Sequence, residues 1–345
     1  MNRYQEHFID LESNIEDALV MLNSLGKDAI LFVLDTNLKL IGSITDGDVR
    51  RGLLKGITIE KKINEILQPY PHFFRLGKTD IKKVIQLRES NFRIIPVLDE
   101  DDRVVKVINF RKNKSYLPID AIIMAGGIGQ RLMPLTKNKP KPLLHVGDKP
   151  IIEHNINRLN CFGIDNYWVS IKYLGDQIEQ YFDKSDLNIH FVREKEPLGT
   201  IGAVSKINDL VHDYVLICNS DILTNLDYEH FFLDFLENDA DMSIVSIPYK
   251  VNIPYAVLEI AAGKVNDLKE KPTYTYYSNG GIYLVKKKLL QLIPKNIRFD
   301  ATDFIECLIQ KGYNIISYPL TGYWLDIGSH EDFIKAQSDI KHISF

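Results

Sequence analysis

Two stretches in the first third of the chain share one pattern of apolar and polar positions. Each stretch holds two apolar runs around a polar turn: 29–34 and 40–44 in the first, 93–98 and 104–108 in the second. Apolar residues at helical spacing precede the two stretches, at 15–25 and at 81–89. A helix followed by a strand, a turn and a second strand cannot cover its own sheet. The pattern therefore predicts two copies that pack together as one small α+β domain over 1–115.

From about residue 118 onward, short apolar runs alternate with longer amphipathic segments. The runs predicted as strands are 121–124, 167–171, 189–192 and 214–218, and the segments predicted as helices are 151–161, 174–182 and 200–207. This alternation predicts a Rossmann-like α/β domain over 118–345, with a mainly parallel sheet and helices on both faces. Ligands of such a sheet bind at the carboxyl ends of its strands. The polar segment 109–118, which ends in proline, is the predicted linker.

Composition and charge narrow the class of partner. The 42 basic and 46 acidic residues leave a formal net charge of −4. Because no block of like charge is present, nothing indicates a nucleic-acid surface. No apolar run approaches the roughly 20 residues that a membrane-spanning helix needs, and the first residues lack the apolar core of a signal peptide. We expect a cytoplasmic enzyme that binds neither nucleic acid nor membrane.

A cluster of glycines follows the first strand of the α/β part. Ala125 is followed by Gly126, Gly127 and Gly129. Glycines at such a place let the backbone turn with positive φ and bring N–H groups close to an anion. A dinucleotide fingerprint is excluded because Leu132 stands where its third glycine would be, and a Walker A loop is excluded because no Gly-Lys-Ser/Thr follows. The loop is predicted to hold phosphate groups in some other way.

Two cations accompany this loop. Arg131 offers several N–H donors in a fixed geometry to a polyphosphate. Pro140 and Pro142 stiffen the backbone on either side of Lys141. The pattern Gly-Gly-x-Gly-x-Arg-Leu-x-Pro-Leu-Thr, followed by Pro-Lys-Pro, resembles the signature of the sugar-1-phosphate nucleotidyltransferases, also called nucleotide-sugar pyrophosphorylases.

The resemblance implies a metal site with two aspartates. Asp221, just past the strand 214–218, corresponds to the family's metal-binding aspartate, and Asp326 lies in a segment similar to its Trp-x-Asp-x-Gly motif. Together they would hold the cofactor Mg²⁺, which commonly takes one or two carboxylates besides phosphate oxygens. The alternatives are that Asp221 caps a helix beginning near Asp227 and that Asp326 is an ordinary turn residue.

The resemblance also implies a base-binding turn. Glu-Pro-Leu-Gly-Thr ends in Gly199 and Thr200, and Gly199 would let the main chain approach a flat base. Glu196 has the hydrogen-bonding edge to read that base. Guanine presents two adjacent donors to a carboxylate, which favours GTP, while thymidylyl and uridylyl transfer stay open. The alternative is that Glu196 lies in solvent.

Two further segments resemble the family's sugar-binding motifs. In Glu270-Lys271-Pro272, Lys271 would neutralise the sugar phosphate and Glu270 would accept hydrogen bonds from sugar hydroxyls. Asn279 and Gly280 begin a segment similar to the strand at the family's sugar pocket, where the absence of a side chain leaves room for the ring. The alternative for Glu270 and Lys271 is a solvated ion pair.

The implied reaction is attack of a sugar-1-phosphate oxygen on the α-phosphorus of a nucleoside triphosphate, with release of pyrophosphate. Arg131 and the glycine loop would hold the β- and γ-phosphates, and Lys141 would neutralise the α-phosphate. Lys271 would neutralise the acceptor phosphate, and Asp221 would hold the metal with Asp326. Glucosamine, mannose and heptose phosphates are open as substrates, including a role in legionaminic acid synthesis. A glycosyltransferase and a nucleotide-sensing regulatory protein are the other function classes.

The repeat in the first third resembles a tandem CBS module. Thr45 and Asp48 stand at the strand-to-helix corner where such modules hold an adenosine ribose. The second copy has 109–111, Asn-Phe-Arg, at the matching place, so at most one cleft keeps the usual ligands. The resemblance implies a regulatory or dimerising role, with an adenine or guanine nucleotide as ligand. It also implies a homodimer or higher homo-oligomer, because CBS pairs commonly associate. The alternative is that Thr45 or Asp46 merely begins a helix.

Overall fold

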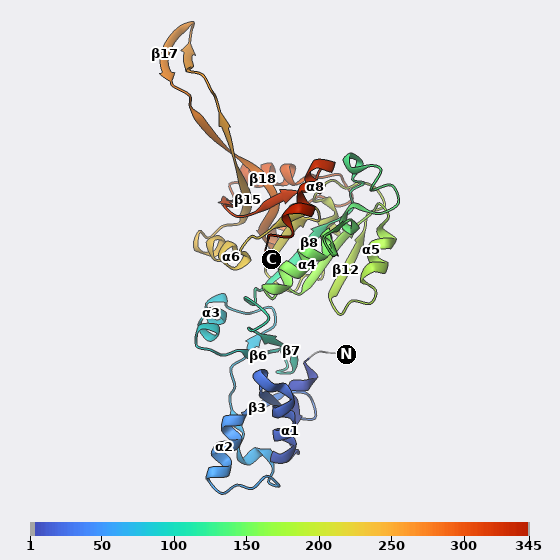
Figure 1. Cartoon of the computed structure of the whole chain (residues 1–345), viewed down its shortest axis with the longest axis vertical. Helices are drawn as coiled ribbons and strands as arrows, with labels where there is room; N and C mark the ends of the chain where they lie inside the picture. The colour runs from blue at the N-terminus through green and yellow to red at the C-terminus, as the bar shows by residue number, and fades with distance from the viewer. Residues whose placement is uncertain (1–3, 344–345) are drawn as a thin grey trace. The chain divides into compact units, whose positions relative to one another are not determined.

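The computed structural model describes residues 4–343, which form two compact units (Figure 1). The first unit runs to Pro118 and includes the short segment Cys161–Gly163. The second unit contains Ile119–Asn160 and the chain from Ile164 onward.

The first unit contains two small sheets. The four-stranded sheet has the order β1-β2-β3-β4, with β1 at Phe8–Asp10, β2 at Ile30–Leu34, β3 at Leu40–Thr45 and β4 at Gln68–Pro69. The three-stranded sheet has the order β5-β6-β7, with β5 at Phe74–Arg75, β6 at Ile94–Leu98 and β7 at Val104–Asn109. The helices are α1 at Ile15–Leu25, α2 at Asp46–Leu54 and α3 at Ile81–Glu89.

The predicted internal repeat is confirmed. Both hairpins, β2-β3 and β6-β7, are antiparallel, and both have a register shift at the same place, after Val33 in one and after Val97 in the other. Phe32 and Leu34 of the first copy share a buried apolar cluster with residues of the second. The two copies therefore cover each other, because neither hairpin can bury its apolar side chains alone.

The second unit is built on a seven-stranded sheet in the order β12-β11-β8-β13-β18-β15-β19. In chain order the strands are β8 (Ile119–Met124), β11 (Asn166–Ile171), β12 (Asn188–Arg193), β13 (Tyr214–Asn219), β15 (Met242–Asn252), β18 (Thr273–Lys286) and β19 (Ile315–Pro319). All neighbours are parallel except β18, which runs antiparallel to β13 and β15. The predicted mainly parallel sheet is confirmed.

Helices connect these strands. They are α4 (Ile151–Cys161), α5 (Gly175–Phe182), α6 (Tyr228–Glu237), α7 (Ala301–Gln310) and α8 (His330–Asp339). The helix predicted over 200–207 was wrong, because only the short 3-10 helix η6 at Gly202–Lys206 forms there. The N–H groups of Ile201 and Gly202 instead both donate to Phe299 O, which draws the turn toward another segment. None of the helices within 4–343 is both long and apolar enough to cross a bilayer.

The ends of two neighbouring strands define the rim that carries the candidate site. β13 pairs with β8 so that Asn219 lies opposite Met124, and Ser220 N donates to Met124 O. The short strands β14 (Ile222–Thr224) and β20 (Trp324–Asp326) then pair antiparallel. This pairing holds β14 and β20, which are far apart in the sequence, side by side at the rim.

β15 and β18 continue past the sheet as a two-stranded ribbon (Figure 1). The ribbon is paired as far as Asn252 and Thr273. Two further antiparallel strands, β16 (Val257–Ala261) and β17 (Lys264–Lys269), form its tip. We call residues 247–278 the arm.

Candidate active site

The glycine loop leaves the end of β8 in a conformation that needs glycine at one position. Ala125 is buried and its N–H donates to Ser170 O. Gly129 has φ of +67°, and a Cβ there would lie 3.0 Å from Thr136 Cγ2 and 3.1 Å from Lys141 Cβ. Gly129 therefore permits both the left-handed turn and the close approach of Lys141. A Cβ on Gly127 would meet nothing within 4 Å.

Gly126 faces a carboxylate that the sequence interpretation missed. A Cβ on Gly126 would lie 2.8 Å from Glu194 Oε1. The Glu194 carboxylate accepts from Ser170 Oγ at 2.5 Å and from Leu198 N at 3.0 Å. The structure places Glu196 differently, with its side chain exposed. The signal for Glu194 was its place directly after the end of β12, on the rim where ligands of this fold bind.

Four predicted charged residues come together beside the loop. Lys141 is only 9% exposed, and its Nζ lies 2.5 Å from Asp221 Oδ2. Asp326 is close enough to Asp221, Lys141 and Arg131 for all three to act on its pKa. The Arg131 guanidinium lies against Gly328, where a Cβ would be 3.1 Å from Nη2. The loop, both cations and both acids thus share one place.

The electrostatics of the two acids fit a divalent cation. Burial, and then the charge of Asp221, raise the pKa of Asp326, while Lys141 and Arg131 act to lower it. Within the described chain, the Oδ1 atoms of Asp221 and Asp326 are buried without a hydrogen-bond partner. Buried carboxylate oxygens that lack donors are unfavourable unless a cation reaches them. Residues 4–343 contain no group of three or more His, Cys, Asp or Glu arranged for a metal, so phosphate oxygens would have to complete the shell.

The helix-cap alternative for Asp221 does not describe this structure. Asp227, and not Asp221, is the N-cap of α6, and its Oδ1 accepts from His230 N at 3.0 Å. Asp221 is left facing Lys141, with 24% of its side chain exposed.

A cavity of about 350 Å³ opens next to the acids. It takes in the predicted residues Thr200, Asn279, Gly280 and Asp326. Polar side chains that the sequence interpretation did not single out also line it: Asn219, Asp300 and Trp324. Since Asp326 lies both in this lining and among the charged residues, the cavity adjoins the charged cluster.

The glycines at this cavity are explained by strand packing. A Cβ on Gly280 would lie 2.7 Å from Val245 O, and Trp324 Nε1 donates to Gly280 O at 2.9 Å. Gly281 has φ of +70°, and a Cβ there would lie 2.7 Å from Asn219 Nδ2. These glycines let β18 approach its neighbours closely, and so position the cavity wall.

The turn at Gly199 and Thr200 is fastened to the start of α7. Gly199 has φ of +80°, and a Cβ there would lie 2.6 Å from Phe299 O. Thr200 N donates to Asp300 Oδ1 at 2.8 Å, and Thr200 Oγ1 accepts from Ala301 N at 2.8 Å. The glycine requirement therefore comes from Phe299, and the turn reaches the cavity through Thr200 and Asp300.

The structure does not bring Glu270 and Lys271 to this cavity. Both side chains are exposed, and both residues lie at the base of the arm's tip. Lys271 has φ of +42°. With a strand rise of about 3.4 Å per residue, Thr273 lies about 20 Å along β18 from Asn279, and Lys271 lies farther out still.

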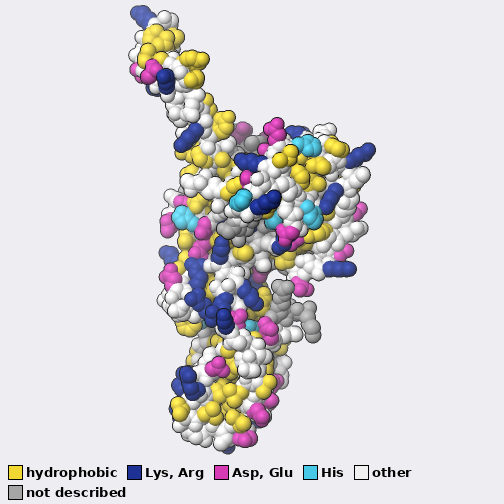
Figure 2. All heavy atoms as spheres, in the orientation of Figure 1, with side chains coloured by type: hydrophobic (Ala, Val, Ile, Leu, Met, Phe, Trp, Pro, Cys, Tyr) yellow, Lys and Arg dark blue, Asp and Glu magenta, His cyan; other side chains and the backbone are white. Residues whose placement is uncertain are grey.

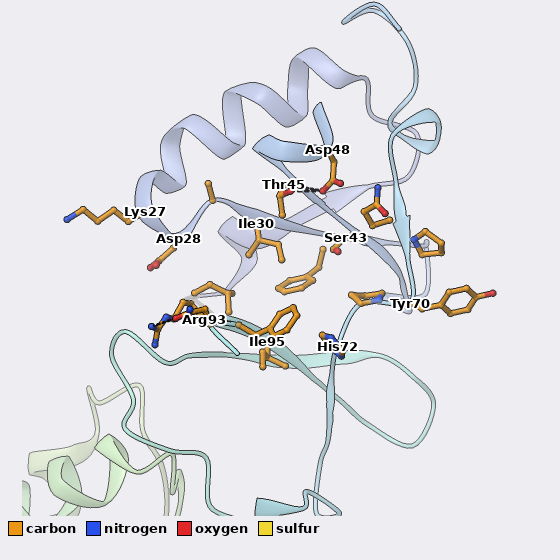
Figure 3. A pocket seen from close by; sticks show the side chains of 18 of the residues that line it. Lys27, Asp28, Ile30, Ser43, Thr45, Asp48, Tyr70, His72, Arg93 and Ile95 are labelled. Carbon is orange, nitrogen blue, oxygen red and sulfur yellow. Dashed lines mark hydrogen bonds between the residues drawn. The ribbon is translucent and has the colours of Figure 1, made fainter. Parts of the chain in front are cut away.

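The first unit has a cavity of its own, of about 460 Å³ (Figure 3). It lies between the two copies of the repeat, with Thr45 and Asp48 from the first copy and Arg93 from the second. Aromatic rings and cations line it together: Tyr70, His72, Phe92, Lys27, Arg51 and Arg93. In Figure 3, Lys27 and Arg93 lie at one end and Tyr70 and His72 at the other.

The predicted CBS ligands Thr45 and Asp48 bond to each other and form a helix start. Thr45 is the N-cap of α2, and its N–H and Oγ1 donate to Asp48 Oδ2 at 2.8 and 2.6 Å. Asp48 Oδ1 pairs with Arg51 at 2.5 Å. The N-cap alternative is thus what the structure shows, in a helix start that also lines the cavity. In the second copy, Asn109 and Arg111 instead bind Asp28 of the first copy.

Family models match both units. The nucleotidyl transferase model matches residues 120–343, and the CBS domain model matches residues 1–55. The chain is 34% identical over 225 residues to the bifunctional protein GlmU of Methanocaldococcus jannaschii, a match covering 63% of this chain and 53% of GlmU. It therefore spans about half the length of that relative.

Another relative and two solved structures are similar to the same region. The D-glycero-α-D-manno-heptose 1-phosphate guanylyltransferase of Aneurinibacillus thermoaerophilus is 32% identical, over 65% of this chain and 99% of that protein. HddC from Yersinia pseudotuberculosis is 27% identical, with a TM-score of 0.50 over 64% of this chain and 99% of HddC. A Bacillus anthracis protein, provisionally assigned as a glucose-1-phosphate thymidylyltransferase and solved with sucrose, shares the fold at 24% identity, with a TM-score of 0.53 over 66% of this chain and 97% of that chain. The chain belongs to the nucleotidyl transferase family and carries a CBS domain ahead of its catalytic unit.

Proposed function

We propose that this chain is a Mg²⁺-dependent guanylyltransferase that converts GTP and a sugar-1-phosphate into a GDP-sugar and pyrophosphate. The observation that carries the proposal is the cluster of buried Lys141 with half-buried Asp221 and Asp326, beside the glycine loop and next to a polar cavity. The relatives named as guanylyltransferases support the choice of GTP.

The reaction forms a bond between a phosphate oxygen of the sugar-1-phosphate and the α-phosphorus. The bond from that phosphorus to the oxygen bridging the β-phosphate breaks, and pyrophosphate leaves. The glycine loop and Arg131 hold the β- and γ-phosphates, and Lys141 donates to the α-phosphate as charge develops there. Asp221 and Asp326 would hold Mg²⁺, which would supply positive charge to the phosphate oxygens.

The cavity is suited to a hydroxyl-rich acceptor. Asn219, Asn279 and Asp300 offer amide and carboxylate groups that donate to or accept from sugar hydroxyls. We propose a hexose, heptose or hexosamine 1-phosphate, with glucosamine-1-phosphate, the acceptor in a nonulosonic acid route, among those to test. The test mixes each of four nucleoside triphosphates with a panel of sugar-1-phosphates and measures released pyrophosphate. GTP should give the highest rate. Sugar transfer from a GDP-sugar without pyrophosphate formation would instead indicate a glycosyltransferase.

We expect Glu194 to read the base. Its carboxylate lies against the glycine loop, where it can accept from the N1–H and N2–H groups of guanine. In Glu194→Gln one acceptor becomes a donor that opposes a guanine donor. Because hydrogen bonds to charged groups contribute about 1.5–3 kcal/mol, kcat/KM for GTP should fall about 10- to 100-fold, with a smaller change for UTP.

The comparison variant for this prediction is Glu196→Gln. The Glu196 side chain is exposed, so its amide should leave kcat/KM for GTP within a factor of about two. A larger loss of kcat/KM for GTP in Glu196→Gln than in Glu194→Gln would show that Glu196, and not Glu194, reads the base.

We propose a second, regulatory function for the first unit, which is binding of an adenine or guanine nucleotide. The cavity between the two copies supports this, because aromatic rings suit a base and Lys27, Arg51 and Arg93 suit a phosphate. Arg51 is 60% exposed on its side chain and can turn from Asp48 to a ligand.

Arg93→Ala should weaken AMP binding by the full chain about 10-fold, because one charge-assisted contact is lost. Titration calorimetry with AMP measures this. Arg103→Ala is the matched control, since Arg103 pairs with Asp101 outside the cavity lining. If titrations with AMP, ATP, GMP and GTP show no binding beyond that at the catalytic site, this proposed function is wrong.

A further inference from the structure

The arm exposes apolar side chains that nothing in the described chain covers. A two-stranded ribbon without a packing partner is marginally stable in water. Side chains along the arm are nevertheless apolar or aromatic and more than half exposed: Tyr249, Tyr255, Ile260, Val265, Tyr276 and Tyr277. Figure 2 shows hydrophobic side chains along this projection and at its tip. Exposed apolar surface of this kind marks a binding surface.

The polar cavity, in turn, lacks a cation. No lysine or arginine lines it within the described chain, whereas Asp300 and Asp326 do. Of the cations nearby, Lys141 is held by Asp221 and Arg131 lies against Gly328. Arg298 pairs with Asp300 at 3.4 Å, with its own side chain largely exposed. If the proposed function holds, on which this inference rests, the cavity must accept a dianionic phosphate ester. Its lining offers that phosphate amide and hydroxyl donors but no positively charged side chain.

Lys271 is an available cation, but its own cavity is out of reach. Among the described residues it makes no ion pair, whereas the neighbouring Lys269 pairs with Glu259. The ribbon is hydrogen-bonded without interruption from Ile247 opposite Ser278 to Asn252 opposite Thr273. Bringing Lys271 back over about 20 Å would break that ladder.

We propose that the arm docks on a second copy of this chain, and that Lys271 of each copy completes the partner's cavity. Apolar side chains of the arm supply the contact area, and Lys271 supplies the positively charged side chain that the cavity lining itself lacks. A twofold dimer buries both arms in the same way, because each copy gives one arm and receives one. The acceptor phosphate then binds a cation from the partner subunit.

The test uses dimers purified through two different tags, one on each chain. In the first, one chain carries Lys271→Ala and the other carries Asp221→Asn. Shared cavities predict that such a dimer has one complete site and about half the wild-type rate, although Lys271→Ala alone is reduced at least ~10-fold. In the second, both substitutions are on one chain and the other is wild type. This dimer should be almost inactive. An almost inactive first dimer together with a second dimer at about half the wild-type rate would overturn the proposal.

A second measurement separates this inference from the proposed reaction. Asn252 and Thr273 are paired, so an Asn-Gly turn can join them in place of 253–272. Sedimentation should show that this shortened chain dissociates at a concentration at least ~10-fold higher than the wild type. An unchanged dissociation constant overturns the docking, whether or not pyrophosphate is released. If the wild type releases no pyrophosphate but the shortened chain dissociates at the higher concentration, the proposed reaction is wrong and the proposed arm interface is supported.

Discussion

Lys141→Ala lowers kcat for pyrophosphate release by at least about 100-fold. The side chain is almost fully buried and its Nζ already lies beside the acids. Loss of one fixed donor aimed at developing charge costs 10²- to 10³-fold in other enzymes. Single-turnover rates with saturating GTP and sugar-1-phosphate give the effect on chemistry alone.

Two further variants test whether the loss of activity in Lys141→Ala could come from misfolding. Lys137→Ala removes an exposed lysine from the same loop and should keep the wild-type rate. Lys141→Ala leaves Asp221 without its cation next to Asp326, so the variant should also melt at a lower temperature. Adding Asp221→Asn should restore the melting temperature and leave the protein inactive. A near wild-type rate in Lys141→Ala would remove Lys141 from the mechanism.

Asp326→Asn should inactivate the enzyme and stabilise the metal-free protein. The amide cannot serve Mg²⁺ as a carboxylate does, and we expect kcat to fall at least about 100-fold. Without metal, burial and the Asp221 carboxylate raise the pKa of Asp326 and disfavour its ionised form in the folded protein. Replacing it should remove this penalty and raise Tm in the absence of metal.

The effect of Asp326→Asn on Tm should depend on pH. Burial and Asp221 raise the pKa of Asp326 in the folded state, so the folded protein binds this proton more tightly than the unfolded chain does. The destabilisation by ionised Asp326 is present above that raised pKa and disappears as pH falls through it. The Tm advantage of Asp326→Asn should therefore be largest near pH 7 and shrink toward pH 4. Mg²⁺ with GTP should raise Tm in the wild type and much less in the variant. Equal ligand stabilisation of both proteins would exclude Asp326 as a metal ligand.

Much of the fold could be predicted from the sequence because burial imposes a regular spacing. The helix 15–25 and the helix 81–89 match α1 and α3 in their bounds, since each buries regularly spaced apolar side chains. The segment expected as a helix over 200–207 forms only a short 3-10 helix, and its start is fastened to Phe299 O by the N–H groups of Ile201 and Gly202. No local pattern contains that partner, which is almost 100 residues away.

The site was predictable where a motif joins residues close in sequence, and less so elsewhere. Gly129 and Lys141 belong to one continuous motif, and the structure places them in contact. Glu194 and Glu196 are alike in type, and only the bond from Leu198 N shows which one turns inward. The arm was missed because a strand pattern does not tell whether a second layer covers the strand, so Glu270 and Lys271 were expected at their own cavity.

The ion pair between Lys141 and Asp221 has one more consequence. Both charged groups lose most of their hydration when the chain folds, long before any nucleotide arrives. Substrate binding therefore exchanges the contact of Lys141 with Asp221 for a contact with a phosphate, without stripping water from a bare ammonium group. The free energy released when GTP binds can then contribute to aligning the reacting phosphates.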